Sequence, residues 1–452
     1  MRTGVWCERA LRNGQVETGV RLSVDSAGIV AAVETGTQPR PGDLVLDGVV
    51  VPAASNAHSH AFHRVLRGRT HTGGADSFWS WRQGMYQAAA ALTPELYEEL
   101  ATAVYAEMVT AGYTSVAEFH YVHHRPDGSP YPGHAMELAL GRAAQAAGIR
   151  LTLLDTCYLA GGFNEPLADG QLRFSDGSAG AWLDRLKDLR HSFEAEFDPA
   201  YVSVGAALHS VRAVPEDALQ AIAAGLDPDL PLHIHVSEQP AENRDCLAAT
   251  GLTPVQLLHR HGLLGPRLAA VHATHLTPED IQLLGDAGAT VVMCPSTEAD
   301  LADGIGPAAA LADAGARIAL GSDQHAIIDP WLEMRALEHG ERLASGTRGR
   351  FAPADLHRAV SDAGAAAQGR RAPGFAPGTS CDLMSVDPAS TRTAGSDPAQ
   401  LALAATAQDV TAVVVGGTLA AERGRHLRLG DPGTLLASAA AKLDAAVREG
   451  QP

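Results

Sequence analysis

The sequence predicts an α/β protein with a TIM-like (β/α)8 barrel and a small β-sandwich domain formed from both termini. Strand-like and helix-like patterns alternate through the middle of the chain, and short strand-like runs occur near both ends. The 452 residues exceed one average domain but suit a large barrel with a companion. We therefore expect a catalytic barrel over residues 49–374 and a small domain made of residues 1–48 and 375–452.

The predicted terminal domain is recognised by short apolar runs separated by glycine and polar residues. Because such runs occur before and after the long middle region, one small sheet built from both ends is expected. The runs are residues 16–22, 28–33, 44–47, 411–419 and 426–429.

The middle of the chain repeats a unit of one helix followed by one buried strand. Thr93 is placed to cap a helix, Gly112 to end it, and residues 113–119 then read as a strand. Thr277 and Gly288 bracket a second unit of the same kind. Strands that alternate with helices in this way pair in parallel.

Eight candidate barrel strands can be counted. The span from the first to the last is about 265 residues (323 minus 58), close to the roughly 250 residues of this barrel. The strands are expected to end near His58, Phe119, Asp155, Leu208, Val236, His272, Cys294 and Asp323.

Composition excludes several classes of protein. A net charge of −18 argues against nucleic-acid binding, which needs a basic face. No run of about 18 apolar residues predicts a membrane span, and the N-terminus has no signal-peptide pattern. The five cysteines form no CxxC pair, which indicates a reduced, cytoplasmic location.

The first chemical motif is His58-Ser59-His60, which follows an apolar run. Residues i and i+2 of a strand share one face, so both imidazoles would point to the same place. Two polar residues in a loop are the alternative.

A second motif follows Pro231, where His235 and Glu238 stand three residues apart as strand becomes loop. This spacing allows one metal ligand and one acid/base group to face the same water. His233 shares the face of His235 but lies deeper, and we interpret it as structural.

His272 and Asp323 end two further apolar runs. Taken alone, an aspartate after a strand could simply cap the next helix. However, the carboxyl ends of parallel barrel strands converge on one face, where catalysis occurs. The recurrence of these residue types at strand ends therefore favours one joint site.

Three histidines and one carboxylate, His58, His60, His235 and Asp323, suit a single zinc ion, although iron or manganese would also accept them. The barrel region contains one lysine, Lys187, in a helical pattern away from the strand ends, so no lysine-bridged second metal is expected.

The metal would lower the pKa of its water toward about 7. Glu238 would accept the proton of that water and pass it to a leaving nitrogen. Asp323 would orient the attacking group, and His272 would donate to the developing tetrahedral centre.

Together these motifs resemble the amidohydrolase superfamily, most of all its mononuclear deaminase branch. A narrower set resembles the formimidoylglutamate deiminase family of histidine degradation. The narrower set is residues 56–62 (NAHSHAF), 76–86 (DSFWSWRQGMY), 118–121 (EFHY), 209–212 (HSVR) and 233–239 (HIHVSEQ).

The resemblance implies hydrolysis of N-formimidoyl-L-glutamate to N-formyl-L-glutamate and ammonia, and it implies a homodimer. Arg82, Tyr121, His209 and Arg212, with His272, would bind this small dicarboxylate. Arginine suits the task because its planar fork pairs with a carboxylate through two hydrogen bonds. Arg82 lies on an aromatic segment that could act as a lid over the site. The alternative is a surface helix whose aromatic side chains pack into the core.

One position departs from the family pattern. His63 stands where the family usually has glutamine. Either His63 still donates to the substrate, or the pocket differs. His325 is given no role, and His123 and His124 are interpreted as loop surface.

Two rival functions remain open. One is deamination of an aminated purine-like or pyrimidine-like ring, which the two arginines disfavour. The other is a non-catalytic metal-binding protein that recruits partners, which Glu238 disfavours because a purely structural metal site needs no acid/base group.

Overall fold

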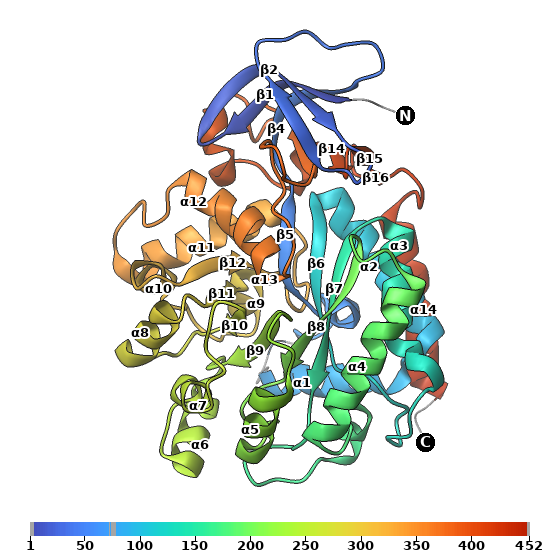
Figure 1. Cartoon of the computed structure of the whole chain (residues 1–452), viewed down its shortest axis with the longest axis vertical. Helices are drawn as coiled ribbons and strands as arrows, with labels where there is room; N and C mark the ends of the chain where they lie inside the picture. Colours follow the sequence, from blue (N-terminus) through green and yellow to red (C-terminus); the bar gives the residue numbers. More distant parts are fainter. Residues whose placement is uncertain (1–3, 72, 74–77, 450–452) are drawn as a thin grey trace.

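The computed structural model describes residues 4–71, 73 and 78–449, and it contains two eight-stranded sheets. Figure 1 shows the terminal sheet at the top and the barrel below it. The barrel strands run in chain order and pair in parallel. They are β5 Ala54–Ser59, β6 Tyr113–His120, β7 Arg150–Cys157, β8 Val202–Leu208, β9 Leu232–Val236, β10 Leu268–His272, β11 Thr290–Met293 and β12 Arg317–Leu320.

The barrel closes through backbone hydrogen bonds between β5 and the residues just after β12. The amides of Ser322 and Asp323 donate to the carbonyl of His58, and the amide of His60 donates to the carbonyl of Asp323. All eight predicted strand ends lie within three residues of the observed ones, and the predicted fold class is confirmed.

Helices between the strands cover the outside of the barrel, as expected for parallel pairing (Figure 1). The helices of the chain are α1 Phe78–Ala91, α2 Pro94–Ala111, α3 Ala135–Ala147, α4 Ala179–Glu196, α5 Glu216–Gly225, α6 Pro240–Thr250, α7 Pro254–Arg260, α8 Pro278–Asp286, α9 Pro295–Asp300, α10 Ala308–Asp313, α11 Pro330–Ser345, α12 Pro353–Arg358, α13 Gly364–Ala367 and α14 Pro432–Glu449.

The predicted helix signals lie where the helices begin and end. The Thr93 hydroxyl accepts from the amide of Leu96 at the start of α2, and Gly112 ends that helix with φ at +111°. Thr277 caps α8 in the same way, by accepting from the amide of Asp280. Lys187 lies exposed on α4, away from the strand ends.

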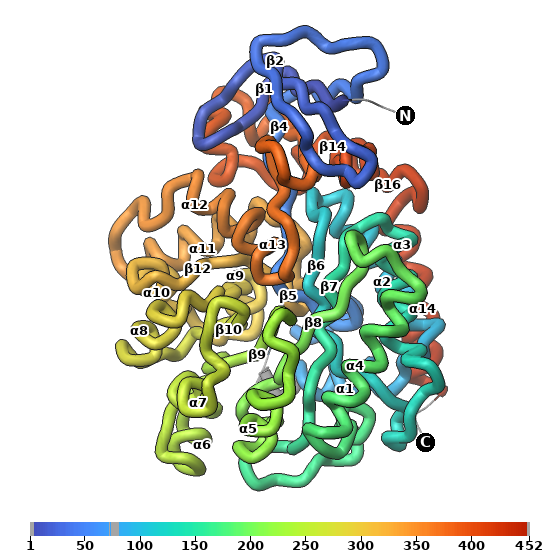
Figure 2. The backbone as a smooth tube through the Cα atoms, viewed as in Figure 1, coloured from blue at the N-terminus to red at the C-terminus, as the bar shows by residue number. Residues whose placement is uncertain are grey.

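The terminal sheet draws its strands from both ends of the chain, which Figure 2 shows by its blue and red segments lying together. Its order is β16-β15-β14-β13-β4-β1-β2-β3, and β1–β4 is the one parallel pair among them. The bounds are β1 Gly4–Arg12, β2 Gln15–Val24, β3 Val30–Glu34, β4 Leu44–Pro52, β13 Leu383–Val386, β14 Val410–Val415, β15 Thr418–Glu422 and β16 Arg425–His426.

The strand β4 carries the chain from the terminal sheet into the barrel, because Ala53 alone separates it from β5. It also runs across residue 48, where the sequence places a domain boundary. The C-terminal helix α14 returns from the terminal sheet to pack beside α2 on the barrel (Figure 1). The division into two domains at residues 48 and 375 stays a prediction.

His123 and His124 are buried, so their interpretation as loop surface is wrong. His123 donates from Nε2 to the carbonyl of Thr156 and lies 2.9 Å from Glu137 through Nδ1. His124 contacts Asp176 at 3.0 Å. Arg185 on α4 bonds both carboxylates, so this cluster ties the loop after β6 and the segment before α4 to the helices α3 and α4.

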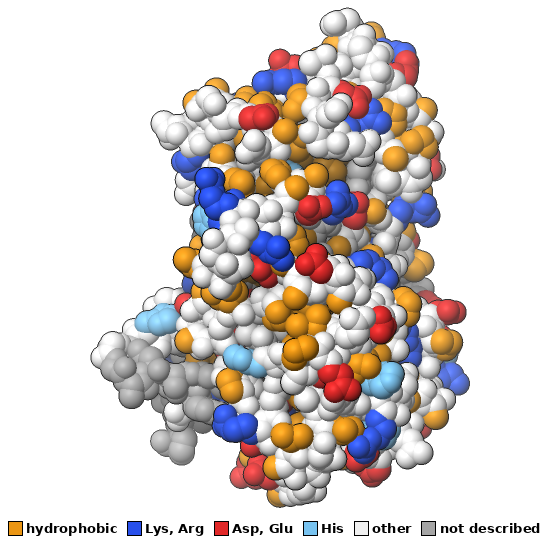
Figure 3. Space-filling view, turned by 90° about the vertical axis from the view of Figure 1, so that its left-hand side faces the viewer, with side chains coloured by type: hydrophobic (Ala, Val, Ile, Leu, Met, Phe, Trp, Pro, Cys, Tyr) orange, Lys and Arg blue, Asp and Glu red, His pale blue; other side chains and the backbone are white. Residues whose placement is uncertain are grey.

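Basic and acidic side chains are interspersed over the face drawn in Figure 3. No helix in the described part of the chain is long and apolar enough to cross a membrane.

Candidate active site

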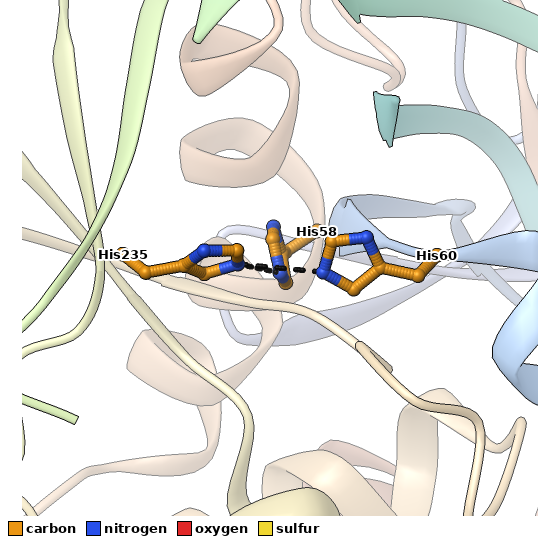
Figure 4. Close-up of side chains that lie close together, drawn as sticks. All are labelled: His58, His60 and His235. Carbon is orange, nitrogen blue, oxygen red and sulfur yellow. Dashed lines mark hydrogen bonds between the residues drawn. The ribbon is translucent and has the colours of Figure 1, made fainter. Parts of the chain in front are cut away.

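Four side chains meet at the carboxyl end of the barrel, from strands far apart in the sequence. His58 Nε2 lies 3.1 Å from His235 Nε2, and His60 Nε2 lies 3.3 Å from the same atom. Asp323 Oδ1 completes the group, at 3.3 Å from His58 and 3.5 Å from His60. Figure 4 shows the three imidazole rings pointing their nitrogens toward one another.

The hydrogen-bond partners of Nδ1 determine the tautomers of His60 and His235. His60 Nδ1 lies 2.8 Å from the carbonyl of Phe119, and His235 Nδ1 lies 2.9 Å from the carbonyl of His209. Because a carbonyl only accepts, each Nδ1 must carry the proton, and each Nε2 then presents a lone pair to the centre.

Burial keeps these rings neutral, since it lowers the pKa of His60 to about 3 and lowers those of His58 and His235. Facing lone pairs repel unless a cation lies between them. The donor set therefore fits a metal ion, and the carbonyl partners are the outer contacts usual for ligating histidines.

The Asp323 carboxylate adds the negative charge of this group. Although burial alone would raise its pKa, the neighbouring His58 holds the pKa of Asp323 well below its ordinary value. Asp323 is therefore ionised and able to bind a cation.

The backbone around the site is unusual. Ser237, His272, Ala273, Asp323 and His325 all have positive φ, between +44° and +68°. Such conformations are uncommon for residues with a side chain, and they cluster at functional sites where the surrounding structure enforces them. Here they lie at or just after the ends of β9, β10 and β12, the strands that bring His235, His272 and Asp323 to the site.

His272 and Glu238 face each other beside this group. His272 Nε2 lies 3.8 Å from Glu238 and 3.9 Å from Asp323, and its Nδ1 lies 3.5 Å from Glu298. Burial opposes the charged form, but the surrounding carboxylates, Glu238 first, raise the pKa of His272 to about 10. Burial also disfavours the charged form of Glu238 and so raises its pKa. His272 is the largest influence that lowers the pKa of Glu238.

A cavity opens over these groups. Every predicted site residue except His58 lines it, and His58 lies fully buried beside His60 and His235. The lining residues are His60, His63, Trp81, Arg82, Met85, Tyr86, Tyr121, Tyr158, Phe174, His209, Arg212, His235, Glu238, His272, Leu301 and Asp323.

His63 reaches the cavity wall, where its Nε2 lies 2.8 Å from the hydroxyl of Tyr121. Burial lowers the pKa of His63 well below its ordinary value, so the ring is a neutral partner for that hydroxyl. His63 and Tyr121, both expected to contact substrate, thus hold each other in place.

The aromatic segment that carries Arg82 lies on α1. Trp81 and Tyr86 line the cavity. The guanidinium of Arg82 lies 5.3 Å from the centre of the Tyr86 ring. Asp76, Ser77 and the side chains of Phe78 and Trp79 lie outside the described residues, so the motif is placed only in part.

Several residues at the site were not found from the sequence. Tyr158 and Phe174 line the cavity, and Glu298 contacts His272. His325 bonds the hydroxyls of Ser59 and Ser322, and so braces the junction that closes the barrel. In the sequence, only its position two residues after Asp323 indicates that His325 lies near the site. His233 bonds the carbonyl of Ala367 at 2.8 Å, away from the cavity, as its structural interpretation requires.

Comparisons with known proteins agree with this arrangement. A model of the amidohydrolase family matches residues 49–420. The formimidoylglutamate deiminase of Pseudomonas aeruginosa is 40% identical over 408 residues, which cover 88% of this chain and 87% of that protein. An 8-oxoguanine deaminase of the same species is 31% identical over 409 residues, with 88% of each chain covered. The crystal structure of an amidohydrolase from Brucella melitensis has a TM-score of 0.88 and 34% identity, covering 97% of this chain and 99% of that one.

Proposed function

The chain belongs to the amidohydrolase family, and from that premise we propose that it hydrolyses N-formimidoyl-L-glutamate to N-formyl-L-glutamate and ammonia. One observation supports this function most directly. Two arginines, Arg82 and Arg212, line the same cavity as a metal-type group and an acid/base pair. A substrate with two carboxylates and one hydrolysable C–N bond matches that combination.

We propose that His58, His60, His235 and Asp323 hold one divalent ion, and that zinc is the ion, because imidazole and carboxylate ligands in this number suit it. Such an ion would lower the pKa of a water molecule at the site and polarise the bond to be broken.

Glu238 is positioned to move protons between water and substrate. A carboxylate is a competent base at neutral pH, and one with a raised pKa also returns the proton readily. Water adds to the formimidoyl carbon as Glu238 accepts its proton. Glu238 passes that proton to the terminal nitrogen, which becomes an amino group. Glu238 then takes the remaining proton from the new hydroxyl and delivers it to the same nitrogen, so that the carbonyl forms, the C–N bond breaks and ammonia leaves.

His272 stabilises the charge that develops beside Glu238. Its raised pKa keeps the ring protonated, so Nε2 donates a hydrogen bond toward the reacting centre. Its contact with Glu298 fixes the ring from the other side.

The proposal is tested by measuring ammonia release from N-formimidoyl-L-glutamate with the purified, metal-loaded enzyme. We expect turnover of this substrate, with N-formyl-L-glutamate as the second product. Activity on aminated bases alone would contradict the proposal.

The rival is deamination of an aminated ring, which the 31% identical 8-oxoguanine deaminase favours. The same assay with 8-oxoguanine, guanine and cytosine separates the two. We expect no activity on them, because a neutral base offers no carboxylate to the two arginines that line the cavity. The homodimer and the cytoplasmic location stay predictions.

A further inference from the structure

A buried carboxylate lies behind the cavity, on the side of Arg212 that faces α6. Glu242 belongs to the first turn of α6, and only 1% of its side chain is exposed. Neither of its carboxylate oxygens has a hydrogen-bond partner of normal geometry among the described residues. A buried carboxylate without a close hydrogen bond is unfavourable unless a cation lies near it.

Arg212 forms an ion pair with this carboxylate. Glu242 Oε1 lies 3.7 Å from Arg212 Nε, which also has no hydrogen-bond partner in the described part of the chain. Burial raises the pKa of Glu242, and Arg212 is the largest influence that opposes this rise, ahead of the nearby amides of Ser237 and Glu238. The guanidinium and the carboxylate therefore stabilise each other's charged forms.

The contact has a direction that matters for binding. Nε lies on one edge of a guanidinium, and the two Nη groups lie on the others. Arg212 lines the cavity beside Glu238 and also a second cavity that Arg82 and Glu242 line. A partner at Nε thus fixes the plane of Arg212 while its Nη groups stay available for a ligand.

We propose that Glu242 is a positioning residue, which holds Arg212 by its Nε edge and so presents the Nη groups to a carboxylate of the substrate. This inference rests on the proposed function, because it assigns Arg212 to a substrate carboxylate. It implies that Glu242 affects substrate binding through Arg212 and does not enter the proton transfer.

Glu242→Gln removes the charge and keeps the shape. We expect KM for N-formimidoyl-L-glutamate to rise about tenfold, with kcat within about twofold of wild type, because an interaction with uniform effect on ground and transition states changes KM. Glu194→Gln, the same exchange at an exposed residue of α4, is the matched control and should leave both constants unchanged.

Two comparisons separate positioning from a purely structural role. In an Arg212→Met background, Glu242→Gln should change kcat/KM less than about twofold, because its partner is gone. On N-propylformamidine, which has no carboxylate, Glu242→Gln should match wild type. An unchanged KM, or an equal loss in both backgrounds and on both substrates, would overturn the inference.

The failure of this inference differs from the failure of the proposed function. If the wild-type enzyme neither turns over N-formimidoyl-L-glutamate nor binds N-formyl-L-glutamate by calorimetry, the proposed function fails. If the wild type does both and Glu242→Gln equals it, only the role of Glu242 fails.

Discussion

At the scale of single residues, the proposed function depends on side chains whose charge is set by burial together with their charged neighbours. Glu238 lies 3.8 Å from His272, and the proposed proton transfers take place beside this pair. Neither is among the four groups that converge at the metal-type centre, so their roles are separable from metal binding.

Glu238→Gln should therefore keep the metal and lose turnover. General acid–base groups contribute about 10²–10⁴-fold to rate, so we expect kcat to fall by about that factor. Elemental analysis of the purified variant should give the same metal content as wild type. A variant with near-normal kcat would refute the role of Glu238 in proton transfer.

Arg212→Ala should mainly weaken kcat/KM. A lost hydrogen bond to a charged group costs about 1.5–3 kcal/mol, which corresponds to a decrease of roughly 10- to 150-fold. Steady-state kinetics on N-formimidoyl-L-glutamate measure this. An unchanged kcat/KM would remove Arg212 from the substrate site.

At the scale of elements, the site depends on the junction between β5 and the chain after β12. Gly321 passes so close to His58 that an added Cβ would lie 2.7 Å from the Cβ of His58 and 3.0 Å from its amide nitrogen. Only glycine lets the two strand ends approach closely enough for Asp323 to reach the histidines.

Gly321→Ala should push these strand ends apart. Overpacking of this kind destabilises by about 1–3 kcal/mol, and here it should also weaken metal affinity because it moves Asp323 away from His58. Metal titration against a competing chelator, with thermal unfolding, measures both effects. Gly180→Ala is a suitable control, since a Cβ there meets no heavy atom within 4 Å. Wild-type metal affinity in Gly321→Ala would contradict the argument.

At the scale of the whole molecule, one buried ion pair joins the barrel to the terminal sheet. Arg150 begins β7, and its Nε and Nη2 bond Asp382, just before β13, at 2.9 and 3.2 Å. Both side chains are more than nine-tenths buried.

Asp382→Ala should destabilise the protein by about 3–5 kcal/mol, because it leaves a buried guanidinium without its partner. Chemical denaturation measures the change. Lys442→Ala breaks the pair with Glu99, which also links the C-terminal region to the barrel but is about half exposed on both sides. That control should leave stability close to wild type. Equal effects of the two changes would contradict the argument.

Metal removal should also lower the stability of the whole chain. An ion that binds only the folded state stabilises it by about 2.7 kcal/mol when its free concentration is 100-fold above Kd. Treatment with a chelator should lower Tm, and added zinc should restore it. The Tm of His235→Ala should change neither with the chelator nor with zinc. A wild-type Tm that does not change with the chelator would contradict the metal site.

The sequence by itself determined the barrel strands and the residues at their ends. Apolar periodicity, helix caps and polar residues after strands are local signals, so they placed all eight strand ends within three residues. Because parallel strands must bring these ends together, the convergence of His58, His60, His235 and Asp323 also followed from the sequence.

Only the tertiary structure decided what surrounds those groups. His123 and His124 read as surface from their neighbours in sequence, yet Glu137, Asp176 and Arg185 bury and pair them. Glu242 likewise looks like an ordinary residue of a helix start until Arg212 is placed beside it. Burial and pairing depend on contacts between segments distant in the chain, and no local pattern encodes those contacts.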